Sequence, residues 1–233
     1  MNVKDLYARL SYGPLQNLAM SGQGTGDIIL SKRESVILAA NEALLRLYSQ
    51  FLLKENDCVV RMLAGVTNYH LKKRYAVMTE PRVEKYPYIL DLPLEPFEED
   101  VIKVLAVYTS QGQKLKLNDE DQHFAVFTPQ ATILQVPRPD IGGALSISYQ
   151  AKHTTLLANE LEQPIELPEV LEGAFLAYVA FQIFSGIGTA EANAKSAEHH
   201  DIYTMICNDV IDRELVAVSN SSRVLKFVER GFV

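Results

Sequence analysis

The sequence predicts an α+β protein in which helices from the N- and C-terminal parts of the chain form one bundle, a small antiparallel β domain is inserted between them, and the chain ends in an extended tail. Three patterns indicate this fold. Apolar residues recur at helical spacing near both ends, they alternate at strand spacing between 57 and 151, and the last segment combines apolar and basic side chains after a polar stretch. The expected segments are 1–56 and 153–215 for the bundle, 57–152 for the β domain and 216–233 for the tail.

Two helices are expected before the β domain. The first covers 2–10, with its apolar side chains on one face, and ends at the turn 11–14. The second runs from 32 to about 53 and is the clearest helix in the chain. Ser31 is followed three residues later by Glu34, which is a capping-box signal for its start. Its apolar stripe consists of Val36, Ile37, Ala40, Leu44, Leu47, Tyr48 and Phe51.

Between 57 and 151 the hydrophobic period changes to two. Alternation is clearest over 101–108 and recurs at 115–117, 132–136 and 145–149. Short stretches of turn residues separate these strands, as hairpins require, so we expect one small antiparallel sheet. We interpret the prolines that precede it, at positions 87, 93 and 96, as a rigid connection into the sheet.

Two further helices are expected after the β domain. The stretch 156–163 is polar and weakly structured, and Pro168 occupies the first turn of a helix that runs to about residue 184. The turn 186–188 separates it from a second helix, from 189 to about 215. Because this turn is short, we expect the two helices to pack as an antiparallel pair.

The composition indicates a globular protein of acidic character. The chain has 22 basic and 29 acidic side chains and a formal net charge of −7. Such a total argues against a domain that binds nucleic-acid phosphates, because those domains are usually basic. Cys58 and Cys207 are the only cysteines, which excludes a disulfide scaffold and suits a reducing cytoplasm. Asp5 interrupts any signal-peptide pattern, and the most apolar stretch, 174–184, is too short to span a bilayer.

Three groups of residues resemble chemical sites. The glycine-rich loop 22–26 has neither the preceding strand nor the following lysine of a phosphate-binding loop, so we interpret it as a turn. In the cluster 198–201, His199 and His200 are adjacent on a helix and therefore point about 100° apart, which does not suit a shared metal ion. Asp209 and Asp212, with Glu214 nearby, could hold a divalent cation across one helical turn, but such carboxylates more often solvate a helix face. We therefore expect no catalytic residue, no cofactor and no bound metal.

The C-terminal tail differs in kind from the rest of the chain. After a polar stretch it carries large apolar side chains mixed with cations, an arrangement that is costly to expose in a free monomer. Two interpretations remain open: the tail folds back on its own bundle, or it docks into a partner subunit. The side chains expected to bind a partner are Arg223, Val224, Leu225, Lys226, Phe227, Arg230 and Phe232.

The order of several segments resembles the head-to-tail connector, or adaptor, proteins of short-tailed double-stranded DNA bacteriophages. The resemblance covers about residues 5–215 as an ordered pattern, and the tail matches in position and character. The segments that carry it are LSYGPLQNL at 10–18, NEALLRLYSQF at 41–51, DVIKVLAVY at 100–108, LKLND at 115–119, VFTP at 126–129, LQVP at 134–137, IELP at 165–168 and AYVAF at 177–181.

The resemblance implies a non-enzymatic structural protein of the virion, made in the host cytoplasm and placed at the head-tail junction. Twelve copies would form a ring between the portal and the tail nozzle, with a central channel for DNA ejection and no membrane contact. The tail 216–233 would insert into the portal, with the apolar residues as anchors and Arg223, Lys226 and Arg230 meeting acidic portal surface. Residues 91–170 and 171–215 carry net charges of −8 and −5. They are expected to line the passage, because a negative wall repels phosphate.

Two alternatives stay open beside this interpretation. One is another neck or tail-completion protein of the same virion, with a different symmetry or position. The other is a metal-dependent hydrolase that would use Glu198, His199 and Asp201 or Asp209 and Asp212.

Overall fold

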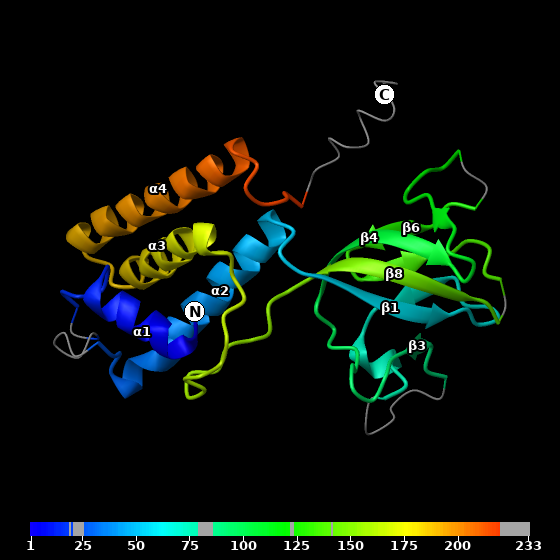
Figure 1. The fold of residues 1–233 in the computed structure, drawn as a ribbon, viewed down its shortest axis with the longest axis horizontal. Helices are drawn as coiled ribbons and strands as arrows, with labels where there is room; N and C mark the ends of the chain where they lie inside the picture. Colours follow the sequence, from blue (N-terminus) through cyan, green and yellow to red (C-terminus); the bar gives the residue numbers. More distant parts are fainter. Residues whose placement is uncertain (19, 21–25, 79–85, 122–123, 141, 220–233) are drawn as a thin grey trace. The chain divides into compact units, whose positions relative to one another are not determined.

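The computed structural model describes the chain except for residues 19, 21–25, 79–85, 122–123, 141 and 220–233. It confirms the predicted α+β fold, with four helices and two small antiparallel sheets (Figure 1). The chain divides into two compact units. The helical unit comprises Met1–Leu53 together with His153–Val233, and the β unit comprises the inserted stretch Lys54–Lys152.

The helical unit contains α1 (Val3–Tyr12), α2 (Leu30–Gln50), α3 (Glu169–Ser185) and α4 (Ala190–Asp212). α3 packs against α1, α2 and α4. It is the most apolar of the four helices, and eight of its seventeen residues are buried. The antiparallel pair expected from the short turn is formed by α3 and α4, as Figure 1 shows.

The two N-terminal helices begin in different ways. At α1, the Asn2 side chain accepts a hydrogen bond from the Asp5 N–H at 2.8 Å, and the Asp5 carboxylate accepts the Asn2 N–H at 3.1 Å, which is a capping box. The box expected at Ser31 and Glu34 is wrong. α2 begins at Leu30, one residue before Ser31, and no side chain caps it, so Ser31 already lies inside the first turn.

The junction of α3 and α4 follows the sequence prediction closely. Pro168 precedes the first residue of α3, and Thr189 caps α4 by accepting the N–H of Ala192 at 3.2 Å. Gly188 has a φ of 76°, a conformation that glycine adopts without strain and that reverses the chain between the two helices. The turn therefore requires glycine at this position.

The irregular segment before α3 is tied to the helices by hydrogen bonds. Asn41 of α2 accepts the N–H of Leu156 at 2.8 Å and donates to its carbonyl at 3.1 Å. The Tyr7 hydroxyl donates to the carbonyl of Ala158, and Lys4 donates its N–H to the carbonyl of Leu161. As expected, the segment 156–163 has no helix or strand, but several of its backbone groups are hydrogen-bonded to the helices.

The β unit holds two antiparallel sheets where one was expected. The five-stranded sheet has the order β3-β1-β8-β4-β5, and the three-stranded sheet has the order β2-β7-β6. A short 3-10 helix (Lys73–Tyr75) follows β2. The strands are β1 (Glu55–Arg61), β2 (Asn68–His70), β3 (Ile89–Leu90), β4 (Val101–Thr109), β5 (Lys114–Leu115), β6 (Phe127–Gln130), β7 (Ile133–Gln135) and β8 (Ala144–Ala151).

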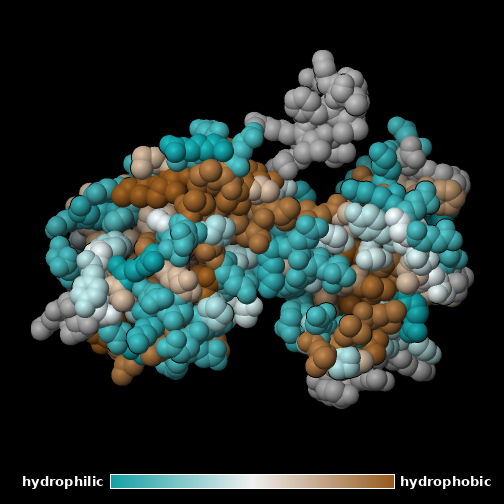
Figure 2. All heavy atoms as spheres, viewed as in Figure 1, coloured by the Kyte–Doolittle hydropathy of each residue, from teal (hydrophilic) through white to brown (hydrophobic). Residues whose placement is uncertain are grey.

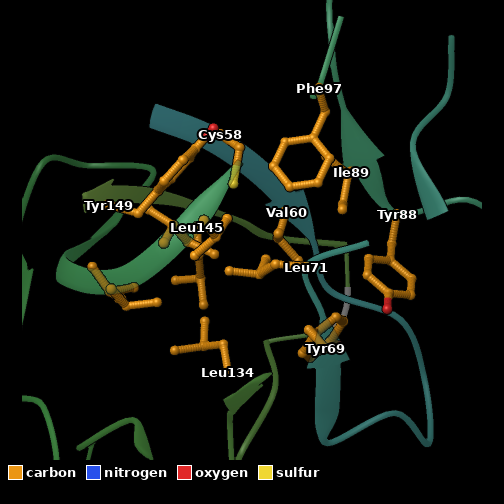
Figure 3. Close-up of a cluster of buried hydrophobic side chains, with 14 of the residues drawn as sticks. Cys58, Val60, Tyr69, Leu71, Tyr88, Ile89, Phe97, Leu134, Leu145 and Tyr149 are labelled. Carbon is orange, nitrogen blue, oxygen red and sulfur yellow. The ribbon is translucent and has the colours of Figure 1, made fainter. Parts of the chain in front are cut away.

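The core of the β unit lies among these strands. Val60, Leu71, Leu134 and Leu145 belong to one buried cluster (Figure 3). The buried Phe97, which follows β3 in the chain, meets Tyr149 of β8 edge to face, with ring centroids 6.2 Å apart. Phe97 thus fastens the segment between β3 and β4 to the core. No helix of the described residues is long and apolar enough to cross a bilayer.

Candidate functional site: interaction surfaces

The residues expected to bind the portal, Arg223 to Phe232, lie outside the described residues. The first residues of the expected tail, 216–219, are described. Ala217 accepts the N–H of Leu52 at 2.8 Å, and Ser219 donates its N–H to the carbonyl of Gln50 at 3.0 Å. Val218 forms an antiparallel bridge with Phe51. The boundary at 216 is therefore corrected: residues 217–219 pair with the end of α2 and belong to the helical unit. All the residues expected to bind a partner follow Ser219 in the chain.

The two adjacent histidines of α4 pack against aromatic rings of α3. His199 stacks on Phe184, with centroids 5.5 Å apart and planes 19° apart, and His200 meets Phe181 at 5.0 Å. Partial burial lowers the pKa of His199, although Glu198 opposes the shift. Both histidines therefore contribute to the packing between α3 and α4.

The acidic residues of α4 are partly paired with neighbouring cations. Lys195 lies 2.7 Å from Glu198, and Arg213 lies 2.7 Å from Asp209, both at exposed positions. Within the described part of the chain, no group of three or more His, Cys, Asp or Glu side chains is arranged to hold a metal ion. The residues of the hydrolase hypothesis are thus not gathered into a metal site there. Of the loop 22–26, only Gly26 is described, with a φ of 77°.

The two cysteines are buried, one in each unit. Burial raises the pKa of the Cys58 thiol to about 12, with a further contribution from Asp57. Burial also raises the pKa of Cys207, whereas a hydrogen bond with Tyr203 and the charge of Arg46 act in the opposite direction. Raised pKa values disfavour the thiolate, the form in which a cysteine attacks a substrate or binds a metal.

The helical unit exposes apolar side chains on α2. Leu38 and Leu45 are 69% and 49% exposed. They are seven residues apart and so lie on the same face, opposite the buried face formed by Ala40, Leu44 and Leu47. Single exposed leucines are common on protein surfaces, whereas two on one otherwise polar helix face form a candidate contact surface.

A second apolar surface lies on α4 and the start of α3. Met205 is 64% exposed, and Ile202 and Ile206 on the same side of α4 are half-buried. Gly173 of α3 lies against Ile206: a Cβ at this glycine would be 3.2 Å from the isoleucine Cδ1. Val170 is also exposed. Figure 2 shows apolar side chains gathered along α3 and α4 on the face in view.

The β unit carries a groove that the sequence analysis missed. It has a volume of about 420 Å³ and runs between β1 and the segment that follows β3. Leu90 and Leu92 line it, together with five carboxylate-bearing residues, Asp57, Asp91, Glu95, Glu98 and Asp100. The signal was present in the alternation of Leu90, Leu92 and Leu94, a strand-like period that was interpreted as a rigid proline-rich connection.

Two of the carboxylates in this groove have structural partners. Asp91 accepts the backbone N–H groups of Met78 and Phe97, at 2.9 and 3.0 Å. Asp100 accepts the Asn56 amide and the Tyr149 hydroxyl, both at 2.9 Å. These bonds hold Asp91 and Asp100 in place, whereas Asp57, Glu95 and Glu98 are exposed at the groove. Comparison with other proteins adds no assignment, since no protein-family model matches the chain and no curated protein matches it significantly.

Proposed function

We propose that the protein is a structural component of a virion: the head-to-tail adaptor of a short-tailed double-stranded DNA phage, which forms a ring of about twelve copies between the portal and the tail nozzle. The observation that carries the proposal is the pair of exposed apolar surfaces on the helical unit, one around Leu38 and Leu45 of α2 and one around Met205 of α4. α3 packs against both helices. A closed ring uses heterologous contacts, for which each subunit needs two different surfaces.

The experiment blocks each surface separately. Leu38→Asp places a charge on the α2 surface, and Met205→Asp does the same on the α4 surface. We expect each variant alone to stop at the monomer, whereas the parent forms rings that electron microscopy and native mass spectrometry can count. An equimolar mixture should form heterodimers and no larger species, because each variant keeps one intact surface that is complementary to the surface kept by the other.

The matched control is Asn193→Asp, which adds the same charge to an exposed position of α4 about three turns away from Met205. It should assemble as the parent does. Rings formed by both single variants would contradict the assignment of the two surfaces. A parent that forms only isologous dimers would contradict the ring itself.

The portal contact is assigned to the tail beyond Ser219. A chain that ends at Ser219 keeps the bonds from Ala217 and Ser219 to the end of α2. We therefore expect it to fold and form rings but to lose attachment to portal-bearing heads, which sedimentation with purified heads measures. Substitution of Arg223, Lys226 and Arg230 by Gln should weaken attachment and reduce its salt dependence. Unchanged attachment of the truncated chain would exclude tail docking.

The acidic part of the chain is proposed to line the DNA passage. On α4, the carboxylates of Glu191, Asp201 and Asp212 belong to exposed residues. A negative wall repels phosphate, so DNA slides past without sequence-specific binding. A ring whose lumen is strongly basic would contradict this part of the proposal, and the acidic residues would then serve the solubility of the free subunit.

A further inference from the structure

We infer that an aromatic pocket of the β unit binds a nucleobase of single-stranded nucleic acid, while cations beside the pocket meet the neighbouring phosphates. The pocket has a volume of about 480 Å³ and is lined from β2, the short 3-10 helix and the segment that leads into β3. Its lining includes the rings of His70, Tyr75, Tyr86 and Tyr88. The inference concerns the β unit alone and does not depend on the head-to-tail role.

The first support is a stack of rings at the pocket. Tyr75 lies nearly parallel to Tyr88, with ring centroids 4.7 Å apart and planes 19° apart. His70 continues the stack on Tyr75, at 6.1 Å and 27°. Tyr86, another lining residue, is 65% exposed. Every base has a flat face that stacks on aromatic side chains, so such rings bind single strands with little regard to sequence.

The second support is that the pocket is held in shape by its own backbone. The Tyr88 hydroxyl accepts the N–H of His70 at 2.9 Å and donates to the carbonyl of the same residue at 3.0 Å. Tyr69, which meets Tyr88 edge to face at 5.2 Å, is anchored similarly (Figure 3). Its hydroxyl accepts the N–H of Leu63 and donates to the carbonyl of Val66, both at 3.0 Å. Because these rings are fixed before a ligand arrives, binding costs less conformational entropy.

The third support is charge. Residues 56–90 carry six basic and three acidic side chains, in a chain whose net charge is −7. Arg74 lies over the Tyr75 ring, 4.6 Å from its centroid, and donates to the Tyr75 hydroxyl at 2.7 Å. Arg61 donates to the carbonyl of Pro87, which stands in the chain between two lining tyrosines, at 3.3 Å. Neither arginine forms an ion pair with a described residue, and no described residue of the lining has a carboxylate.

Rings and cations together favour a ligand that joins flat groups to negative charge. A nucleotide has both, whereas a proline-rich peptide docks on aromatic side chains without needing cations. A duplex keeps its bases inside the stack, so a single strand is the form that can place a base in the pocket. Lys73 contributes little positive charge, because Glu98 lies 3.7 Å from its ammonium. Since few phosphates are met, base stacking supplies much of the affinity.

The test measures binding of a labelled oligothymidylate of about twelve nucleotides to the full-length protein, by fluorescence anisotropy at low salt. We expect saturable binding that weakens as the salt concentration rises, because phosphates that meet arginines release counterions. Tyr86→Ala should weaken binding about five- to hundredfold, because it removes a ring on which a base stacks. Arg74→Gln should also weaken binding and should reduce the slope of log affinity against log salt by about 0.7.

The matched controls are Phe124→Ala and Lys114→Gln. They change one aromatic and one basic residue that are exposed in the β unit and lie outside the pocket lining. Both variants should bind the oligonucleotide as the parent does. Tyr86 is mostly exposed, so the circular dichroism spectrum should show Tyr86→Ala folded. Equal losses in Tyr86→Ala and Phe124→Ala would overturn the inference, because binding would then not distinguish the pocket from other exposed rings.

Competing ligands separate base stacking from other chemistries. An abasic oligonucleotide of the same length keeps the phosphates without the bases, and a duplex keeps its bases paired. We expect both to displace the labelled strand far less well than the unlabelled single strand does. Equal displacement by either would overturn the inference and leave a general anion site. A parent that ignores the single strand but binds a proline-rich peptide would overturn it in favour of peptide docking.

Photo-cross-linking locates the bound base. An oligothymidylate in which 5-iodouracil replaces one thymine is irradiated in complex with the parent protein, which joins the base to an aromatic ring in contact with it. We expect mass spectrometry of the digested complex to find the cross-link at Tyr86, Tyr75 or His70. Cross-links confined to residues outside the pocket lining would overturn the inference, however tightly the strand binds.

Discussion

The β unit is one continuous stretch, whereas the helical unit is assembled from two stretches that the β unit separates. The strands at the two ends of the insertion pair with one another: Ala151 donates its N–H to the carbonyl of Lys54 at 3.0 Å. The β unit thus begins and ends at one place. The helical unit, by contrast, needs α1 and α2 to meet α3 and α4 across an insertion of about a hundred residues. The β unit therefore has all its strands within one stretch of chain, whereas the helical unit needs both of its stretches to form its core.

The largest effect is expected from separating the two units. Residues 54–152 expressed alone should keep their sheets, because the core and the strand pairing are internal to this stretch. Residues 1–53 alone should stay largely unfolded, because α2 buries its apolar face against α3. The measurement is the nuclear magnetic resonance spectrum of 54–152. Its amide signals should be dispersed and should match those of the whole protein. A collapsed spectrum for 54–152 would break the comparison.

Truncation of one core side chain in each unit tests whether the two units unfold independently. Phe175 of α3 is fully buried in the helical unit. Phe175→Ala should lower the free energy of unfolding of that unit by about 3–5 kcal/mol, because it leaves a cavity. The urea midpoint followed by helical circular dichroism should fall. The protection of β-unit amides from hydrogen exchange should stay unchanged. Ile147→Ala in β8 is the matched change and should do the reverse.

The α3–α4 contact gives a smaller effect. The position of Gly173 against Ile206 leaves space for a hydrogen but little for a side chain. Gly173→Leu should destabilise the helical unit by about 1–3 kcal/mol through overpacking. Gly173→Ala is the control: its tight contact with one flexible methyl is offset by the better helix propensity of alanine, so its urea midpoint should stay close to that of the parent.

The sequence predicts the helical unit better than the β unit, for a physical reason. Helix positions such as Pro168 and Thr189 act locally, through capping and turn chemistry that a short window contains. Pairing of strands is not local. The division into two sheets depends on whether β7 meets β2 or β4, and short strands of similar composition do not encode that choice.

The interaction surfaces show the same limit. The leucine alternation at 90–94 was visible in the sequence, but the groove between it and β1 depends on where β3 stops pairing, at Leu90. The pairing of residues 217–219 with the end of α2 could not be predicted either, because the bonds of Ala217 and Ser219 join residues far apart in the chain. The expected cap at Ser31 shows that a local signal also fails, because the helix starts at Leu30, two residues earlier than expected.

The smallest effect is expected from the buried thiols, one in each unit. The Cys58 pKa rises to about 12 from an ordinary value of 9.0, so between these values the folded β unit keeps a proton that the unfolded chain has lost. The stabilising contribution is complete below pH 9 and is lost as the pH rises from 9 toward 12, by at most about 1.4 kcal/mol per pH unit. Urea midpoints of the β unit, measured between pH 8 and pH 10, should fall, and Cys58→Ala should flatten that fall.

Cys207 supplies the matched case in the helical unit. Burial raises its pKa too, but the Tyr203 hydrogen bond and Arg46 oppose the shift. Cys207→Ala should therefore flatten the alkaline loss of helical stability by less than Cys58→Ala does in the β unit. Equal slopes in the two units would mean that the polar partners of Cys207 do not stabilise its thiolate. The two buried sites would then differ in packing alone, and the contrast between the units would not extend to their electrostatics.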